Sequence, residues 1–156
     1  MKRKWAIEDE RFFGIGVYRP KTEVNIGTLW RTAHIFGASF IFVIDKRYKR
    51  QASDTEKTWS RIPLFQYTDF DHFYDSLPYS CQLVGIELDK RSTKIEEFHH
   101  PQRAAYLLGA EDNGLPRAVS DRCHHLVQLP GTTSLNVSVA GSIVLYDRIT
   151  GNRFGH

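Results

Sequence analysis

The continuous apolar run Phe40-Ile-Phe-Val-Ile44 constrains the fold more than any other segment of the chain. An unbroken run of this length suits a strand that is buried on both faces, which is typical of a parallel sheet covered by helices on both sides. Other segments with strand or helix character alternate along the chain. We therefore expect an α/β protein with a mainly parallel sheet flanked by helices.

The other predicted strands are short apolar segments, and the predicted helices have apolar residues at helical spacing. The strands are expected at Phe12–Tyr18, Phe40–Ile44, Leu64–Tyr67, Cys81–Leu88, Ala104–Leu108 and His125–Leu129. The helices are expected at Val24–Phe36, Phe70–Leu77, Arg117–Asp121 with Pro116 in the first turn, and Ser134–Ile149 with Ser134 as the N-cap. No internal repeat or linker interrupts the sequence, so residues 1–156 are expected to form a single domain.

Composition excludes several classes of protein. No apolar run approaches the roughly 18 residues of a membrane span, so no membrane partner is expected. The two cysteines, Cys81 and Cys123, provide neither a disulfide framework nor a zinc spacing. The formal net charge of +3 permits a polyanionic partner without demanding one. We expect a cytoplasmic protein.

Three segments that are far apart in the sequence combine glycine with polar side chains near predicted strand–helix junctions. They are Asn25–Ala33, Leu108–Pro116 and Leu129–Val137. Glycine allows the backbone to approach a ligand closely, and the polar residues supply chemistry or orientation. Three such segments in one small chain suggest a cofactor site.

The second segment has the strand, glycine turn and helix of a nucleotide-binding corner. It lacks both the dinucleotide fingerprint Gly-x-Gly-x-x-Gly and the Gly-Lys-Ser/Thr of a phosphate loop. Glu111 and Asp112 would also repel a phosphate. The corner better suits a ligand without phosphates, and a purely structural turn is the alternative interpretation.

The first and third segments each carry a polar residue on a predicted helix. Arg31 falls almost opposite the apolar stripe of its helix, so it faces solvent, a partner chain or a ligand. The third segment leads into the last helix, whose first backbone N–H groups are free to bind a ligand. Asn136 near that helix start could equally serve only as a local hydrogen-bonding residue.

Other polar clusters carry less information. The run Lys46-Arg-Tyr-Lys-Arg50 could bind RNA phosphates and stack on a base, although a solvated loop is the commoner explanation. The pairs His99–His100 and His124–His125 lack a completing ligand set, so no metal site is expected. No Gly-x-Ser-x-Gly elbow is present, and Cys123 beside His124 does not make a catalytic dyad.

Taken together and in this order, the three segments resemble the motifs of the SpoU (TrmH) family of RNA ribose 2'-O-methyltransferases in the SPOUT superfamily. Asn25, Gly27 and Arg31 match Asn-x-Gly-x-x-x-Arg. The second and third motifs, Gly-x-Glu-x-x-Gly and Ser-x-Asn, are matched by Gly109, Glu111, Gly114, Ser134 and Asn136. The resemblance implies a C-terminal deep trefoil knot, S-adenosylmethionine bound in that knot, and a homodimer with active sites near its interface.

The resemblance also implies roles for individual residues. The implied catalytic residues are Arg31, Glu111, Asn136 and Asn25. The implied cofactor-binding residues are Ile86, Glu87, Leu88, Gly109, Glu111, Leu129, Pro130, Gly131, Ser134, Leu135 and Asn136. The RNA-binding residues are expected to be Arg19, Arg31, Lys46, Arg47, Lys49, Arg50 and Arg61, with Lys21 beside them.

The leading interpretation is therefore a dimeric S-adenosylmethionine-dependent tRNA 2'-O-methyltransferase. Ribosomal RNA is the alternative substrate within the same chemistry. A non-catalytic RNA-binding module on the same fold is the alternative from another class, although the polar motif residues are intact. A generic nucleotide-binding α/β protein would require phosphate-loop chemistry, which the sequence lacks.

Overall fold

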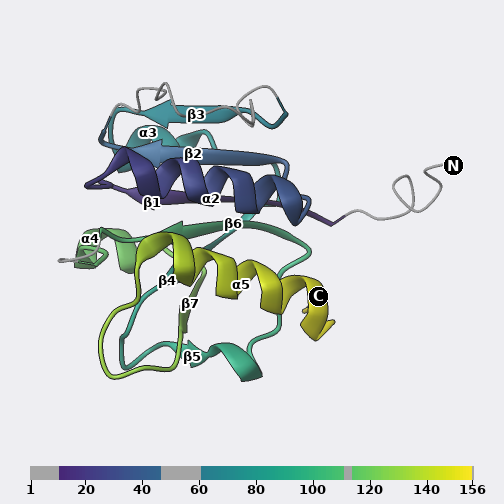
Figure 1. Ribbon diagram of the computed structural model, residues 1–156. Coiled ribbons are helices and arrows are strands. Elements are labelled where there is room, and N and C mark those ends of the chain that lie inside the picture. Colours follow the sequence, from purple (N-terminus) through teal and green to yellow (C-terminus); the bar gives the residue numbers. More distant parts are fainter. Residues whose placement is uncertain (1–10, 47–60, 111–113, 156) are drawn as a thin grey trace, which may run out of the picture.

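The computed structural model describes residues 11–46, 61–110 and 114–155. Within these ranges the strands form one sheet in the order β3-β2-β1-β6-β4-β7-β5, and every neighbouring pair is parallel (Figure 1). The strands are β1 (Phe12–Tyr18), β2 (Phe40–Ile44), β3 (Leu64–Tyr67), β4 (Gln82–Ile86), β5 (Thr93–Lys94), β6 (Arg103–Leu108) and β7 (His125–Gln128). The predicted α/β class with a parallel sheet is confirmed.

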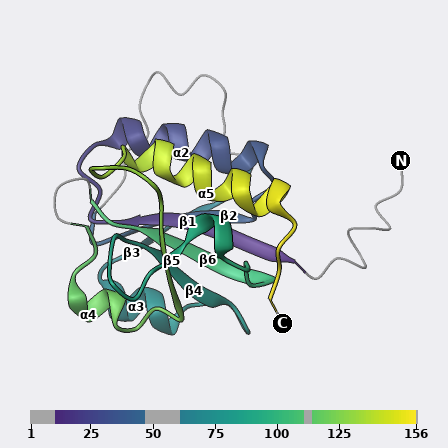
Figure 2. The ribbon, with the colours of Figure 1, turned by 90° about the horizontal axis from the view of Figure 1, so that it is seen from below.

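Helices cover both faces of this sheet. Helices α2 (Glu23–Ile35) and α5 (Val137–Gly151) lie side by side on one face, whereas α3 (Phe70–Asp75) and α4 (Arg117–Ser120) lie on the other (Figure 2). A short 3₁₀ helix, η2 (Ile95–Glu97), follows β5. The molecule therefore has three layers, with the sheet in the middle.

Strand β2 shows how the sequence forms the two halves of the core. Ile41 and Val43 pack into the apolar cluster beneath α2 and α5. Phe40, Phe42 and Ile44 alternate with them and pack into the cluster on the opposite face. Alternate strand residues point to opposite faces, so the expected burial of this strand on both faces is confirmed.

Several element boundaries differ from those predicted. Strand β5 and helix η2 were not expected, because the two residues of β5 are exposed and have no apolar alternation. Helix α3 ends at Asp75 rather than Leu77. Helix α4 has only four residues, and Pro116 is its N-cap residue rather than part of its first turn.

The strand order determines where a ligand can bind. Strands β6, β4 and β7 are neighbours although other elements separate them in the sequence, so the turns after them meet at one edge of the sheet. Ligands of open parallel sheets bind at this carboxyl edge. Among the described residues, no helix has the length and apolar character needed to cross a membrane.

Candidate functional site

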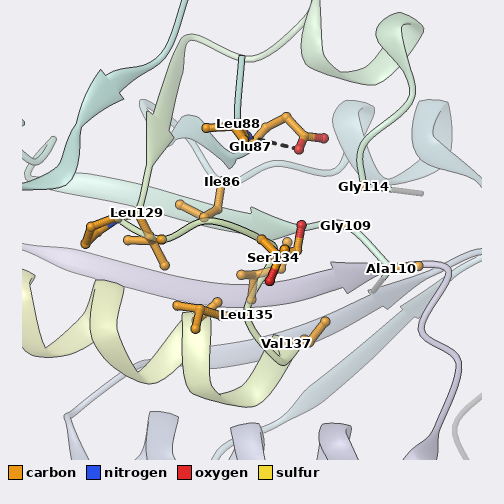
Figure 3. A pocket seen from close by; sticks show the side chains of 15 residues that line it. Ile86, Glu87, Leu88, Gly109, Ala110, Gly114, Leu129, Ser134, Leu135 and Val137 are labelled. Atoms are coloured by element: carbon orange, nitrogen blue, oxygen red, sulfur yellow. Dashed lines mark hydrogen bonds between the residues drawn. The ribbon is translucent and has the colours of Figure 1, made fainter. Parts of the chain in front are cut away.

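A pocket lies at the carboxyl ends of β4, β6 and β7 (Figure 3). Three turns and the start of α5 contribute to its walls. The lining residues are Ile86, Glu87, Leu88, Leu108, Gly109, Ala110, Gly114, Leu129, Pro130, Gly131, Thr133, Ser134, Leu135, Val137 and Ala140. The second and third motif segments therefore meet in one place, as the sequence predicts.

The walls of the pocket are mainly apolar side chains and backbone. Glu87 is the one charged side chain among the described lining residues, and Thr133 and Ser134 add hydroxyl groups. Because no described lining residue is Lys or Arg, these walls suit a flat apolar group with a few hydrogen-bonding atoms better than a phosphate.

The glycines of the second motif are required by packing. Gly114 donates its backbone N–H to the Ala110 carbonyl at 2.9 Å and closes a tight turn. A Cβ on Gly109 would lie 2.3 Å from the backbone carbonyl carbon of Gly114. We expected this glycine to admit a ligand to the backbone, but the space of its missing side chain is filled by Gly114. Glu111 lies outside the described residues.

The N-cap of helix α5 is a different residue of the third motif from the one predicted. Asn136 is the N-cap, and its Oδ1 accepts from the backbone N–H groups of Ser138 at 2.9 Å and Val139 at 3.3 Å. The predicted cap at Ser134 is wrong, because the helix starts at Val137 and its N-cap residue is Asn136. Ser134 lines the pocket instead.

Asn136 also joins the third motif to the first. Its Nδ2 donates to Oδ1 of Asn25, in the first turn of α2, at 3.0 Å. Because Oδ1 of Asn136 accepts the cap bonds, only the amide nitrogen remains to face Asn25. The two motif asparagines therefore fix the start of α5 against the start of α2. Asn136 does not line the pocket.

Arg31 lies in the middle of α2 and is exposed, as predicted from its place opposite the apolar stripe. It lies seven residues after Val24 and four before Ile35, so these three side chains share one outward side of the helix. Arg31 is not among the residues that line the pocket of this chain.

Some of the expected RNA-binding residues lie together near the ends of β1 and β2. Arg19 follows β1 and pairs with Asp45 after β2 at 3.0 Å. Lys46 donates from Nζ to the Lys21 carbonyl at 2.9 Å. Arg61 is exposed before β3. The expected residues Arg47, Lys49 and Arg50 lie outside the described part of the chain.

His124 and Cys123, which are adjacent in the sequence, each have a structural partner, and Sγ of Cys123 lies 3.6 Å from the Val119 carbonyl. Nδ1 of His124 accepts the backbone N–H of Leu83 at 2.8 Å. Burial raises the pKa of Cys123 to about 12, so its thiol stays protonated. Within the described ranges, no group of three or more His, Cys, Asp or Glu side chains could hold a metal ion.

The sequence missed several lining residues, namely Leu108, Ala110, Gly114, Thr133, Val137 and Ala140. Gly114 belongs to the second motif, and its place in the motif could have indicated it. The apolar residues gave no such indication, because an apolar residue in a strand or helix predicts core packing equally well.

The fold and the pocket define an α/β protein with a ligand site at the carboxyl edge of a parallel sheet. A family model described as the SpoU rRNA Methylase family matches residues 13–146. The chain therefore belongs to the SpoU methylase family.

Individual relatives show the same similarity. The chain is 24% identical over 134 residues to the mouse (Mus musculus) tRNA (guanosine(18)-2'-O)-methyltransferase TARBP1, covering 79% of this chain and 8% of that protein. An AdoMet-bound rRNA methyltransferase from Sinorhizobium meliloti superposes with a TM-score of 0.78 at 23% identity, covering 87% of this chain and 55% of the other.

A second solved structure concerns 2-OH methylation of C/U34 on tRNA. It superposes with a TM-score of 0.74 at 22% identity, and the match covers 92% of this chain and 99% of the other. At these identities the structures show the shared fold. The chain spans about half the length, or less, of the curated relatives that it matches.

Proposed function

We propose that the protein is an S-adenosylmethionine-dependent methyltransferase that methylates a ribose 2'-hydroxyl of tRNA. The observation that carries this proposal is the pocket at the carboxyl ends of β4, β6 and β7. Residues of the second and third motifs line this pocket. The first motif is joined to the third through Asn25 and Asn136.

The pocket fits S-adenosylmethionine, which has no phosphate. Apolar walls at Ile86, Leu129 and Leu135 suit the adenine, and the turns at Gly109 and Pro130–Gly131 offer backbone groups. We assign cofactor contacts to the residues expected from the sequence that line it: Ile86, Glu87, Leu88, Gly109, Leu129, Pro130, Gly131, Ser134 and Leu135. The AdoMet-bound S. meliloti neighbour supports this assignment through its shared fold.

The cofactor supplies an already activated methyl group, so the protein mainly aligns the ribose and manages one proton. Arg31 holds a substrate phosphate and polarises the 2'-hydroxyl. It does not act as the base, because a guanidinium keeps its proton far above neutral pH. Asn25 and Asn136 fix the helix start on which this arrangement depends, and Glu111 orients Arg31 or the ribose.

Two similarities favour tRNA as the substrate. The mouse relative is named as a tRNA methyltransferase. The structure of C/U34 methylation on tRNA is matched over nearly its whole length, so its size is close to that of this chain. The S. meliloti relative is named as an rRNA methyltransferase, which makes ribosomal RNA the second candidate.

We also propose a homodimer that uses the outer surface of α2 and α5. This surface is apolar and exposed, and we call it the α2/α5 face. It consists of Val24, Ile35, Val139, Ile143, Tyr146 and Ile149, which are between 37% and 69% exposed. An apolar surface of this kind marks an interaction site. Arg31 shares the outward side of α2 with Val24 and Ile35, so dimerisation would bring it to the interface.

A C-terminal deep trefoil knot is part of the same proposal. The segment after β7 lines one pocket together with the turns after β4 and β6, and α5 then packs beside α2 on one face of the sheet. The position of the last segment beside the turns after β4 and β6 is compatible with a knot in which this segment passes through an earlier loop.

The test is methyl transfer from labelled S-adenosylmethionine to separately purified undermodified tRNA and ribosomal RNA. Wild type, Arg31→Ala and the control Arg117→Ala are compared, and labelled RNA is digested to nucleosides. Arg117 is a matched control because its side chain is 87% exposed on α4, on the other face of the sheet. We expect a 2'-O-methylated nucleoside from tRNA, lost in Arg31→Ala and retained in Arg117→Ala.

Each other outcome has a definite meaning. Label on ribosomal RNA alone would change the substrate, and label on a base would refute the 2'-O assignment. Cofactor binding without transfer to either RNA would favour a non-catalytic module, whereas ATP binding without S-adenosylmethionine binding would refute the cofactor. A pH–rate profile with an essential group whose apparent pKa disappears in Arg31→Lys would contradict the phosphate-holding role of Arg31.

A further inference from the structure

Glu87, directly after β4, binds the backbone of a distant turn. Its Oε2 accepts the backbone N–H of Leu115, 28 residues further along the chain, at 2.5 Å. Its Oε1 accepts the N–H of Leu88 at 3.0 Å (Figure 3). One carboxylate therefore joins the turn after β4 to the segment that leads from the second motif into α4.

The backbone of Glu87 is itself held in place. Its N–H donates to the Val127 carbonyl of β7 at 2.9 Å, and its carbonyl accepts from Oγ of Ser92 at 2.7 Å. The carboxylate is thus presented from a fixed position at the end of the sheet, where it can define the position of a neighbouring segment.

Gly114 packs directly against this carboxylate. A Cβ on Gly114 would lie 2.4 Å from Oε2 of Glu87, and the residue has a φ of +62°, which favours glycine. The space of the missing Gly109 side chain is in turn filled by the Gly114 backbone. The two motif glycines and Glu87 thus form one continuous set of contacts, and all three line the pocket.

We propose that Glu87 is a positioning residue that sets the pocket wall at Gly114, and that the second motif uses glycine at position 114 to admit this carboxylate. The inference rests on the proposed function in taking S-adenosylmethionine as the ligand of the pocket. It also revises the cofactor contact assigned to Glu87 above, because it gives the carboxylate to the protein backbone rather than to a cofactor hydroxyl or amine. Removing the carboxylate would then disturb the pocket even when no ligand is bound.

The first test measures hydrogen exchange of the Leu115 amide in the ligand-free protein, together with the Kd for S-adenosylmethionine. Glu87→Ala, Glu87→Gln and the control Glu96→Ala are compared; Glu96 is an exposed glutamate on η2. In Glu87→Ala we expect Leu115 exchange to rise and cofactor affinity to fall, each about tenfold. Glu87→Gln keeps one acceptor oxygen and should recover part of both effects, and Glu96→Ala should match wild type.

The second test is a double-mutant cycle on cofactor affinity. Gly114→Ala alone places a methyl group against the carboxylate, and we expect it to cost less in the Glu87→Ala background, where that contact is gone. Additive effects of the two substitutions would overturn the inference. Weakened cofactor binding with unchanged Leu115 exchange in Glu87→Ala would also overturn it, because that is the behaviour of a direct ligand contact.

These outcomes are separable from failure of the proposed function. If wild type does not bind S-adenosylmethionine, the proposed ligand is wrong. Leu115 exchange and the same mutant cycle on the free energy of unfolding then still decide whether Glu87 fixes the turn at Gly114.

Discussion

Gly141 on α5 lies directly against Leu29 on α2. A Cβ on Gly141 would stand 2.5 Å from Cδ1 of Leu29, 3.2 Å from Cδ1 of Ile15 and 3.3 Å from Cδ1 of Leu108. Leu29 and Ile15 are fully buried and Leu108 nearly so. The two helices approach each other this closely because position 141 has no side chain.

Gly141→Ala is therefore expected to destabilise the protein. In an exposed helix, replacing glycine by alanine gains about 1 kcal/mol of helix propensity. Here the added methyl group overpacks a filled core, which costs about 1–3 kcal/mol. We expect the free energy of unfolding in urea to fall, whereas Gly155→Ala should leave it nearly unchanged, because there the nearest atoms lie 3.8 and 3.9 Å from the added Cβ. A more stable Gly141→Ala protein would contradict the close packing.

The two functions of Asn136 can be separated by substitution. Asn136→Ala removes both the cap of α5 and the bond to Asn25, and we expect it to lower the free energy of unfolding by about 2 kcal/mol. Asn25→Ala removes the bond to Asn136 and leaves the cap of α5 in place, and a loss of at least about 1 kcal/mol is expected. Urea unfolding monitored by circular dichroism measures both.

Asn136→Asp is the informative control for this pair. A carboxylate still accepts the two cap bonds and is favoured at a helix N-terminus, but it cannot donate to Asn25. Its stability should lie between those of wild type and Asn136→Ala, because it loses the bond to Asn25 and keeps the cap. If Asn136→Asp is as unstable as Asn136→Ala, the bond to Asn25 contributes more than the cap.

The sequence predicted well the elements that a local pattern specifies. The ranges of β1, β2 and β3 agree with the predicted strands, because each is an apolar or alternating run that polar residues, proline or serine delimit. Strand β5 has two exposed residues and leaves no such pattern. The cap of α5 was misplaced because Ser134 and Asn136 are both good N-caps, and only the backbone conformation decides between them.

Contacts between distant segments have no comparable local pattern. The motif residues predicted that the turns after β6 and β7 share a site, but not that Glu87 binds the backbone at Leu115. The pairing of Asn25 with Asn136 spans 111 residues and likewise depends on how α2 and α5 are placed. Such contacts depend on tertiary packing. Sequence motifs can therefore identify functional residues without indicating which of them are in contact.

His100 belongs to a buried polar cluster away from the pocket. Its Nδ1 lies 2.6 Å from the Tyr106 hydroxyl, and its Nε2 lies 2.8 Å from Oδ2 of Asp147. Arg148 donates to the same hydroxyl at 2.9 Å, so the hydroxyl can donate its own hydrogen to Nδ1, and Nε2–H then donates to Asp147. Only a neutral imidazole can accept a hydrogen bond at Nδ1 and donate one at Nε2 in this way. Burial lowers the pKa of His100 and outweighs the opposing effect of Asp147.

We therefore expect stability to fall on acidification. An unfolded histidine titrates near its ordinary pKa of about 6.5, above that of folded His100, so below this pH the unfolded chain binds more protons. The contribution of His100 to the free energy of unfolding is fully present above about pH 6.5, and it is lost as the pH falls toward the pKa of the folded His100. His125, whose pKa burial also lowers, adds to the same trend.

Urea unfolding at about pH 7.5 and about pH 5.5 checks this prediction. His100→Gln should be less stable than wild type at the higher pH, because it disturbs a buried hydrogen-bond network, but should lose less stability on acidification. His99→Gln alters the exposed neighbour and should retain the wild-type pH dependence. An unchanged pH dependence in His100→Gln would exclude His100 as its source.

The proposed role of the α2/α5 face can be tested by placing a charge on it. If this face forms the homodimer, a charge placed on it would be buried without a partner at the interface, which is costly. We expect Ile143→Glu and Tyr146→Glu to convert a dimer into single chains in sedimentation equilibrium and to remain folded by circular dichroism. Tyr79→Glu is the control, because Tyr79 is 90% exposed and lies between α3 and β4, away from this face.

The substitutions that separate the dimer should also abolish methyl transfer. Arg31 shares the outward side of α2 with Val24 and Ile35, so a monomeric variant would lose the active site near the interface and with it the transfer to RNA. A variant that is monomeric but fully active would show that one chain completes the site alone. A dimer that survives both glutamate substitutions would instead place the interface on another surface.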